Sequence, residues 1–171
     1  ERREVEKEYR ALVLGIPGGR GGDKLTGEWR DHLERSDRDG RVEVAAVGGR
    51  TPNATTEYTV VKHLAAAGVA VLALKPREGR THQLRVQCAR HGHPIAGDDR
   101  YDDFTANRHL QSEAALKLMF LVAHKLVFKH PRTGKRMSFE AELRPELASV
   151  LEKLGRTAKK VPRKKQSAHR A

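Results

Sequence analysis

The segment Gly79–Val86, Gly-Arg-Thr-His-Gln-Leu-Arg-Val, concentrates the side chains of this chain that could do chemistry. It follows the apolar run Val69–Leu74, which is typical of a strand, and it opens a short helical pattern. Two arginines, a histidine and a glutamine therefore gather at one strand-to-helix junction, whereas a solvated helix would scatter such groups over its outer face. Arginine and the free amides of a helix N-terminus both bind phosphate. The junction indicates a site for a phosphate-rich partner, with Arg80 as the candidate phosphate ligand.

The charge of the whole chain points to the same kind of partner. Lys and Arg number 34 against 22 Asp and Glu, which gives a net charge of +12 at pH 7. Residues 155–171 contain seven of the basic residues and no acidic one, so this tail and the body before it are both basic. A polyanion is the natural partner of such a chain, and nucleic acid is the commonest one. For the tail alone, a solubilising role without a specific partner is the alternative.

Several other classes of protein are excluded by composition. No stretch approaches the roughly 18 apolar residues that a membrane span needs, so we expect no membrane partner. Cys88 is the single cysteine, which rules out an internal disulfide framework and fits a reducing, cytoplasmic location. The histidines His82 and His91 are nine residues apart, half a turn out of phase on a helix, so we expect no metal site.

The elements that must position the junction predict a single α+β domain. Gly, Pro and alternating β-branched residues delimit the expected segments. We expect a helix end at 1–8, strands at 9–15, 55–64 and 69–74, a hairpin from 27–33 and 41–47, a helix from Thr81 to Gly92, a surface loop at 98–111, a hairpin from 118–128 and 136–143, and a closing helix at 145–154. Strands outnumber helices in this pattern, and they form runs rather than alternating with helices, which favours a mixed, largely antiparallel sheet with flanking helices.

Two further side chains have positions that suit a binding site. Leu84 and Cys88 are four residues apart and define the apolar stripe of the expected helix, and Arg85 points about a quarter-turn away from it, at the rim. Tyr9 begins a strand and could stack on an unpaired base, as aromatic side chains do in RNA complexes. Ordinary packing at the strand edge is the alternative for Tyr9, and a surface ion pair is the alternative for Arg85.

The chain resembles the RluA-type RNA pseudouridine synthases over most of its length, from Lys7 to about Leu154. Five blocks in matching order carry the resemblance, and the long Gly-Arg-Thr-His-Gln-Leu-Arg-Val segment with its Gly-His-Pro-Ile-Ala-Gly-Asp sequel is the most specific of them. The blocks are 7–15, 55–61, 74–86, 92–101 and 126–131.

The resemblance implies a pseudouridine synthase fold and the isomerisation of uridine to pseudouridine in structured RNA, without cofactor or metal. In such enzymes the target nucleotide is flipped out of its stack. By position, Tyr9 matches the tyrosine that stacks on the target base and helps remove its C5 proton. Arg85 matches the arginine that pairs with the nucleophilic aspartate, and Leu84 matches the apolar residue that packs into the pocket. The residues expected to contact RNA are Lys7, Arg80, His82, Gln83 and Arg90.

This sequence departs from the family pattern in two places. It has no His-Arg-Leu-Asp block, which carries the nucleophile in the family, and Asp31–Glu34 is only faintly similar to it. We expect that block upstream of Glu1, so that the sheet lacks its N-terminal strands and this chain alone is inactive. Val122 stands where many members have histidine, with His124 close by.

The resulting hypothesis has two parts. Residues 1–154 are expected to form the C-terminal part of a pseudouridine synthase catalytic domain, and 155–171 a basic, disordered tail. The expected substrate is ribosomal RNA, with transfer RNA as the open alternative, and the protein is expected to be a monomer. A non-catalytic RNA-binding or ribosome-assembly module on the same scaffold is the rival hypothesis.

Overall fold

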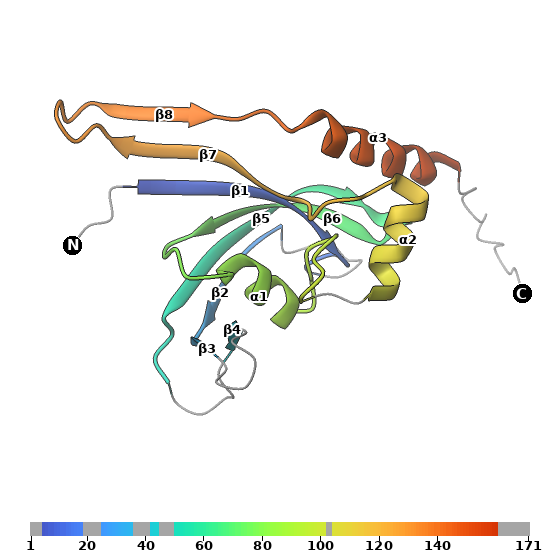
Figure 1. Ribbon diagram of the computed structural model, residues 1–171, viewed down its shortest axis with the longest axis horizontal. Helices are drawn as coiled ribbons and strands as arrows, with labels where there is room; N and C mark the ends of the chain where they lie inside the picture. The colour runs from blue at the N-terminus through green and yellow to red at the C-terminus, as the bar shows by residue number, and fades with distance from the viewer. Residues whose placement is uncertain (1–4, 19–24, 36–41, 45–49, 102–103, 161–171) are drawn as a thin grey trace, which may run out of the picture.

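The computed structural model describes residues 5–18, 25–35, 42–44, 50–101 and 104–160. Its centre is a six-stranded sheet in the order β2-β5-β6-β1-β7-β8, each strand running antiparallel to its neighbours (Figure 1). These strands are β1 (Val5–Leu14), β2 (Thr26–Asp31), β5 (Ala54–Leu64), β6 (Val69–Pro76), β7 (Leu121–Lys129) and β8 (Arg136–Glu140). The remaining elements are β3 (Leu33–Arg35) paired with β4 (Val42–Val44), η1 (Ala65–Ala67), α1 (Gln83–Arg90), α2 (Phe104–Ala114) and α3 (Pro145–Lys160). The predicted α+β fold is confirmed, and the six-stranded sheet is wholly antiparallel.

Both faces of the sheet are covered around the middle strands β6 and β1, because side chains alternate between the faces along a strand. On one face Ala11 and Val13 of β1 pack in one apolar cluster with Leu84 and Cys88 of α1. On the other face Leu12 packs in a second cluster, with buried side chains from α2 and α3. Figure 1 shows α1 and α3 on opposite sides of the sheet. None of the described helices is long and apolar enough to cross a membrane.

The strands nearest the candidate site agree with the sequence-based prediction. The segments predicted at 55–64 and 69–74 form the antiparallel pair β5 and β6, joined through Gly68 in the left-handed conformation. The second predicted hairpin is also present, as β7 and β8. These predictions were reliable because turn residues bound each run of apolar or β-branched side chains.

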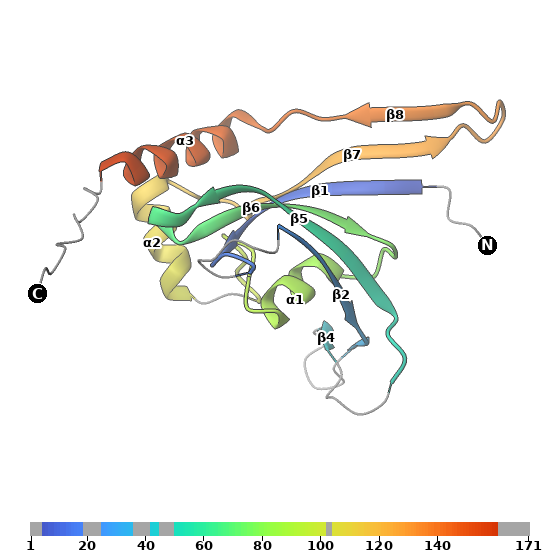
Figure 2. The ribbon, with the colours of Figure 1, turned by 180° about the vertical axis from the view of Figure 1, so that it is seen from behind.

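Four predicted segments are wrong. Val5–Glu8 is strand rather than the end of a helix, since it pairs with β7, and β1, β7 and β8 extend together beyond the other strands (Figure 2). The expected loop at 98–111 contains α2, whose Leu110 is buried within an otherwise polar sequence. Val42–Val44 pairs with β3 rather than with β2, which pairs with β5 instead. Residues 41 and 45–47 of that predicted strand lie outside the described residues.

The fourth error concerns the ends of helices. α3 does not end before Gly155 but continues to Lys160, since glycine weakens a helix without forcing it to stop. The predicted tail therefore begins inside α3, and its residues 161–171 lie outside the described residues. At α1, Thr81 does not cap the helix: the N-cap residue is His82, and it makes no side-chain capping bond.

The segment between α1 and α2 runs through the interior and connects the site to the core. Ala96 donates to the carbonyl of Leu12 at 2.8 Å and accepts from the amide of Phe120 at 2.8 Å. Gly97 follows with φ of +79°, and a Cβ there would lie 2.6 Å from the carbonyl oxygen of Leu118. Asn107 of α2 accepts from the Gly97 amide at 2.7 Å and donates to the Asp98 carbonyl at 2.9 Å. The loop is thus held in one conformation by β1, by α2 and by close backbone packing.

We expect Gly97→Ala to destabilise the protein by more than the cost of a left-handed alanine alone. That conformational cost is about 1–2 kcal/mol, and the backbone contact with Leu118 adds to it. Gly134→Ala is the matched control, since Gly134 has φ of +67° and a Cβ added there would have no atom of the described residues within 4 Å. Urea unfolding of both variants measures the difference, and equal losses would show that the packing at Gly97 contributes nothing.

Candidate functional site

The centre of the candidate site is an ion pair between Arg85 and Asp98. Arg85 Nε donates to Asp98 Oδ2 at 2.7 Å and Nη2 donates to Oδ1 at 2.6 Å, which is the bidentate geometry of a strong arginine–carboxylate pair. The Asp98 side chain is fully buried and that of Arg85 is 17% exposed. Asp99 approaches the same guanidinium at 3.5 Å, but its side chain is 97% exposed. Arg85 was expected to pair with a carboxylate that lies upstream of these residues. In the structure the Arg85 guanidinium pairs instead with Asp98 of the same chain.

Asp98 is ionised at neutral pH despite its burial. Burial acts to raise the pKa of this carboxyl group. The hydrogen bonds and positive charge of Arg85, with the backbone amides of Arg100 at 2.9 Å and Tyr101 at 3.1 Å, outweigh that effect and hold the pKa below its usual value. The same pair raises the pKa of Arg85, chiefly through the Asp98 hydrogen bond. The site therefore contains a fixed cation and a fixed anion.

Tyr101 also contacts the Arg85–Asp98 ion pair, through the face of its ring. The Arg85 guanidinium lies over the Tyr101 ring, 5.1 Å from its centroid, in a cation–π contact. The Tyr101 hydroxyl lies 3.0 Å from Nδ1 of His82 and accepts from the Val42 amide at 3.4 Å. Tyr101 thus links the start of α1, the ion pair and β4. Neither Tyr101 nor Asp98 had a predicted role, although both belong to the block 92–101; the burial of Asp98 and the contacts of Tyr101 are signals that only the folded structure supplies.

Tyr9 and Leu84 face the same apolar cluster, on the α1 side of the sheet. Tyr9 is half-buried and lies at an irregularity of the sheet, where Glu8 pairs with Lys125 but Tyr9 pairs with Ala123. His124 is the extra residue of this bulge on β7. Bulges re-aim nearby side chains and are common beside active sites. The structure therefore brings two of the three predicted catalytic side chains into one cluster, and Arg85 adjoins it through Leu84.

Two of the predicted RNA ligands line one cavity. Lys7 Nζ donates to the Glu78 carbonyl at 3.4 Å, and Arg80 Nε donates to the Asn53 carbonyl at 2.6 Å. The cavity has a volume of about 500 Å³ and is lined by Val5, Lys7, Arg77, Glu78, Gly79 and Arg80. Arg90, also predicted to contact RNA, is exposed in the last turn of α1, at the other end of the helix from Arg80. The basic groups are therefore distributed along the helix rather than gathered at its start.

The structure gives Gln83 a place inside the protein. Its side chain is 3% exposed and donates to the Thr55 carbonyl, the Thr56 hydroxyl and Glu78 Oε2, each at 3.2 Å. Its own oxygen accepts from the Arg80 amide at 3.2 Å. These contacts differ from the predicted RNA contact, since they use the side-chain amide to hold the loop before α1 against β5.

A second buried amide anchors the rest of α1. Gln87 accepts from the Thr56 hydroxyl at 2.6 Å and donates to Asp31 at 2.7 Å. His91 contacts the same carboxylate at 3.1 Å and stacks on Trp29. Asp31, in the segment only faintly similar to the family block, is thus a structural partner of α1. Within the part of the chain that the structure describes, no group of three His, Cys, Asp or Glu side chains is arranged to hold a metal.

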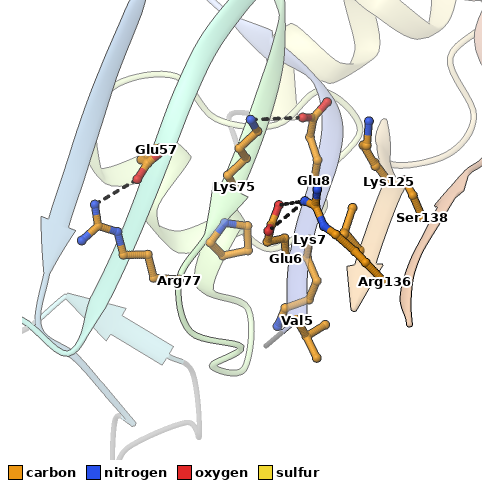
Figure 3. Close-up of a pocket in the computed structure, with 12 residues that line it drawn as sticks. Val5, Glu6, Lys7, Glu8, Glu57, Lys75, Arg77, Lys125, Arg136 and Ser138 are labelled. Atoms are coloured by element: carbon orange, nitrogen blue, oxygen red, sulfur yellow. Dashed lines mark hydrogen bonds and ion pairs between the residues drawn. The ribbon is translucent and has the colours of Figure 1, made fainter. Parts of the chain in front are cut away.

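A second cavity, with a volume of about 870 Å³, lies along β1, β5, β6, β7 and β8 and shares Val5, Lys7 and Arg77 with the cavity that Arg80 lines (Figure 3). Three of its basic side chains pair with acids: Arg136 with Glu6, Lys75 with the largely buried Glu8, and Arg77 with Glu57 (Figure 3). Glu8 adjoins Tyr9 in β1, so it points to the opposite face of the sheet. The cavity is thus lined largely by paired charges, and it meets the candidate site at Lys7.

We expect Asp98→Asn to lower the free energy of unfolding by roughly 3 kcal/mol at pH 7, because it leaves a largely buried arginine without its anion. Since folding lowers the pKa of Asp98, the wild-type advantage is complete above the usual aspartate pKa of about 3.9 and is lost as the pH falls through the lower folded value. Urea unfolding from pH 7 down to pH 3 tests this. Asp99→Asn, which alters only the exposed neighbour, should change little; a matching loss there would contradict the assignment.

Comparisons with known proteins agree on one family. Residues 1–90 match the family model described as RNA pseudouridylate synthase. The chain is 31% identical over 157 residues to Ribosomal large subunit pseudouridine synthase C of Haemophilus ducreyi, covering 88% of this chain and 44% of that protein. It is 34% identical over 166 residues to an uncharacterized RNA pseudouridine synthase of Chlorobaculum parvum, covering 89% and 48%.

Structural similarity leads to the same family. The chain superposes on Human RNA Pseudouridylate Synthase Domain Containing 1 with a TM-score of 0.67 and 26% identity, covering 94% of this chain and 68% of that one. The chain spans less than half the length of the two bacterial relatives. The family match over more than half of the chain shows that this protein belongs to the RNA pseudouridylate synthase family.

Proposed function

We propose that this chain is the part of an RNA pseudouridine synthase that receives the target uridine and orients the nucleophile. The observation that supports this most is the bidentate Arg85–Asp98 pair beside Leu84, on the sheet face that Tyr9 shares. Phosphate contact alone does not require an arginine that a buried carboxylate holds in one orientation, since an exposed arginine binds phosphate as well. This favours an enzyme over the non-catalytic module.

The proposed reaction breaks the bond between the uracil N1 and the ribose, rotates the base and joins C5 to the same ribose carbon. C5 loses its proton and N1 gains one, so the product is an isomer of the substrate. Leu84 and the half-buried ring of Tyr9 would hold the flipped base, and Tyr9 would assist the proton's departure. Arg85 would keep the nucleophilic carboxylate ionised and oriented, since a nearby guanidinium favours the charged form of an acid. Asp98 engages Nε and Nη2, so a second carboxylate would approach from Nη1.

The proposed substrate is ribosomal RNA, because relatives at about 30% identity are named ribosomal large subunit pseudouridine synthases. Lys7, Arg80 and Arg90 would contact the phosphate backbone, and the net charge of +12 would strengthen the encounter. The nucleophilic aspartate is the part of the mechanism that these 171 residues do not supply in a His-Arg-Leu-Asp block. A monomeric state and a cytoplasmic location belong to the same proposal.

We expect the 171-residue chain to bind a structured ribosomal RNA segment and to form no pseudouridine. Affinity should fall steeply with salt, because each neutralised phosphate releases counterions and contributes a log–log slope of about −0.7 to −0.9. Filter binding between low and physiological salt gives the slope, and mass spectrometry of the recovered RNA detects pseudouridine. Product formed by the chain alone would contradict the assignment of the nucleophile to a separate segment.

In a protein that carries this chain together with the His-Arg-Leu-Asp block, we expect Arg85→Lys to reduce kcat by about 100-fold, since small misplacements of reacting groups cost that much. Lysine keeps the charge but loses the bidentate geometry, so RNA affinity should change little. Arg90→Lys is the control for a basic residue on the same helix. Equal losses in kcat and affinity for Arg85→Lys would make Arg85 a phosphate ligand instead.

A further inference from the structure

The backbone of His82 is held in an unusual conformation at the entrance to α1. Its φ is 54° and its ψ is 17°, in the left-handed region that side chains other than glycine seldom adopt. Such residues persist only where surrounding contacts hold them, and they concentrate at functional sites. His82 makes no side-chain capping bond to α1, so helix capping does not explain the conformation.

Tyr101 is the contact that holds the His82 side chain. The two rings meet edge to face, with centroids 5.7 Å apart and planes at 76°. The Tyr101 hydroxyl lies 3.0 Å from Nδ1 of His82 and already accepts a hydrogen bond from the Val42 amide. A phenol has one proton to donate, and donating it to Nδ1 completes the hydroxyl's bonding. In this arrangement Nδ1 is the acceptor, and the imidazole proton resides on Nε2.

The charges around His82 favour the neutral imidazole. Burial is the largest effect that lowers the pKa of His82, and the positive charges of Arg85 and Arg100 lower it further. Asp98 acts in the opposite direction, but its charge is paired with Arg85. A histidine with a pKa below about 6.5 is uncharged at pH 7. The Tyr101 hydrogen bond, burial and the two neighbouring arginine charges thus favour a neutral His82. This partly exposed side chain presents a single N–H group, at Nε2.

We propose that His82 binds the RNA substrate as a neutral Nε2–H donor to a base carbonyl oxygen, and that Tyr101 is the positioning residue that fixes this tautomer. A neutral donor beside Arg80 suits an uncharged acceptor, because Arg80 already supplies the attraction for phosphate and Arg85 is paired with Asp98. The RNA ligand rests on the proposed function, whereas the tautomer and the role of Tyr101 rest on the contacts and charges around His82. The predicted RNA contact by His82 thereby gains a specific chemical form.

The first test is the tautomer, measured by two-bond ¹H–¹⁵N correlation spectra of the ¹⁵N-labelled 171-residue chain at pH 7. His82→Gln assigns the resonances. We expect the wild type to be neutral with the proton on Nε2, and Tyr101→Phe to give a mixture of tautomers. Tyr58→Phe, which removes a hydroxyl from a ring stacked on Trp29, should leave His82 unchanged. A charged His82, a proton on Nδ1, or an unaltered tautomer in Tyr101→Phe would overturn the proposal.

The second test compares RNA affinity and its salt dependence among variants. Glutamine can place an N–H near the Nε2 position, so His82→Gln should bind within about 3-fold of wild type, whereas His82→Asn, which tolerates the left-handed backbone but is too short, should lose roughly 3- to 10-fold. Both should keep the wild-type salt slope, while Arg80→Gln should reduce it by about 0.7–0.9. A reduced slope for His82→Gln would make His82 a cationic phosphate ligand. If the chain binds no RNA, the proposed function fails, and the tautomer measurement still decides the role of Tyr101.

Discussion

The buried carboxylate of Asp98 is the constraint on which the site depends. A buried charge is tolerated only when it is paired and hydrogen-bonded, and Asp98 receives two bonds from Arg85 and two from backbone amides. Those amides come from a loop whose shape requires Gly97 and the side chain of Asn107. The hydrogen bonds that the Asp98 carboxylate needs therefore tie together the loop after α1, α2 and the Arg85 side chain.

The same need for satisfied polar groups positions α1 against the sheet. Gln83 and Gln87 are buried one turn apart, and both contact Thr56 of β5. Leu84 and Cys88 supply the apolar contacts on the same helix. A helix of two turns has little stability of its own, so these contacts determine where its rim residues lie. Arg85 thus stands on a short helix that the sheet holds in place.

Sequence reasoning succeeded where a signal is local. The apolar and β-branched runs of β5 and β6, and the turn at Gly68, predicted a hairpin that the structure contains. It failed where distant contacts decide: α2 was expected to be a loop, because its few apolar residues are dispersed, yet Leu110 is buried against the core. Gln83 was expected to contact RNA, since it belongs to the polar cluster at the junction, and no local pattern reports that Thr55, Thr56 and Glu78 surround it.

The sequence by itself determined the family and the basic charge, since these depend on the order and type of side chains. Tyr9, Leu84 and Arg85 could be named without coordinates, because they occur within recognisable blocks. Only the tertiary structure decided that Arg85 is clamped by Asp98 and that Tyr101 joins the pair to His82. Arg85 and Asp98 are 13 positions apart in the sequence, and His82 and Tyr101 are 19 apart. Such contacts form only once folding has brought the segments together and water no longer competes for their polar groups.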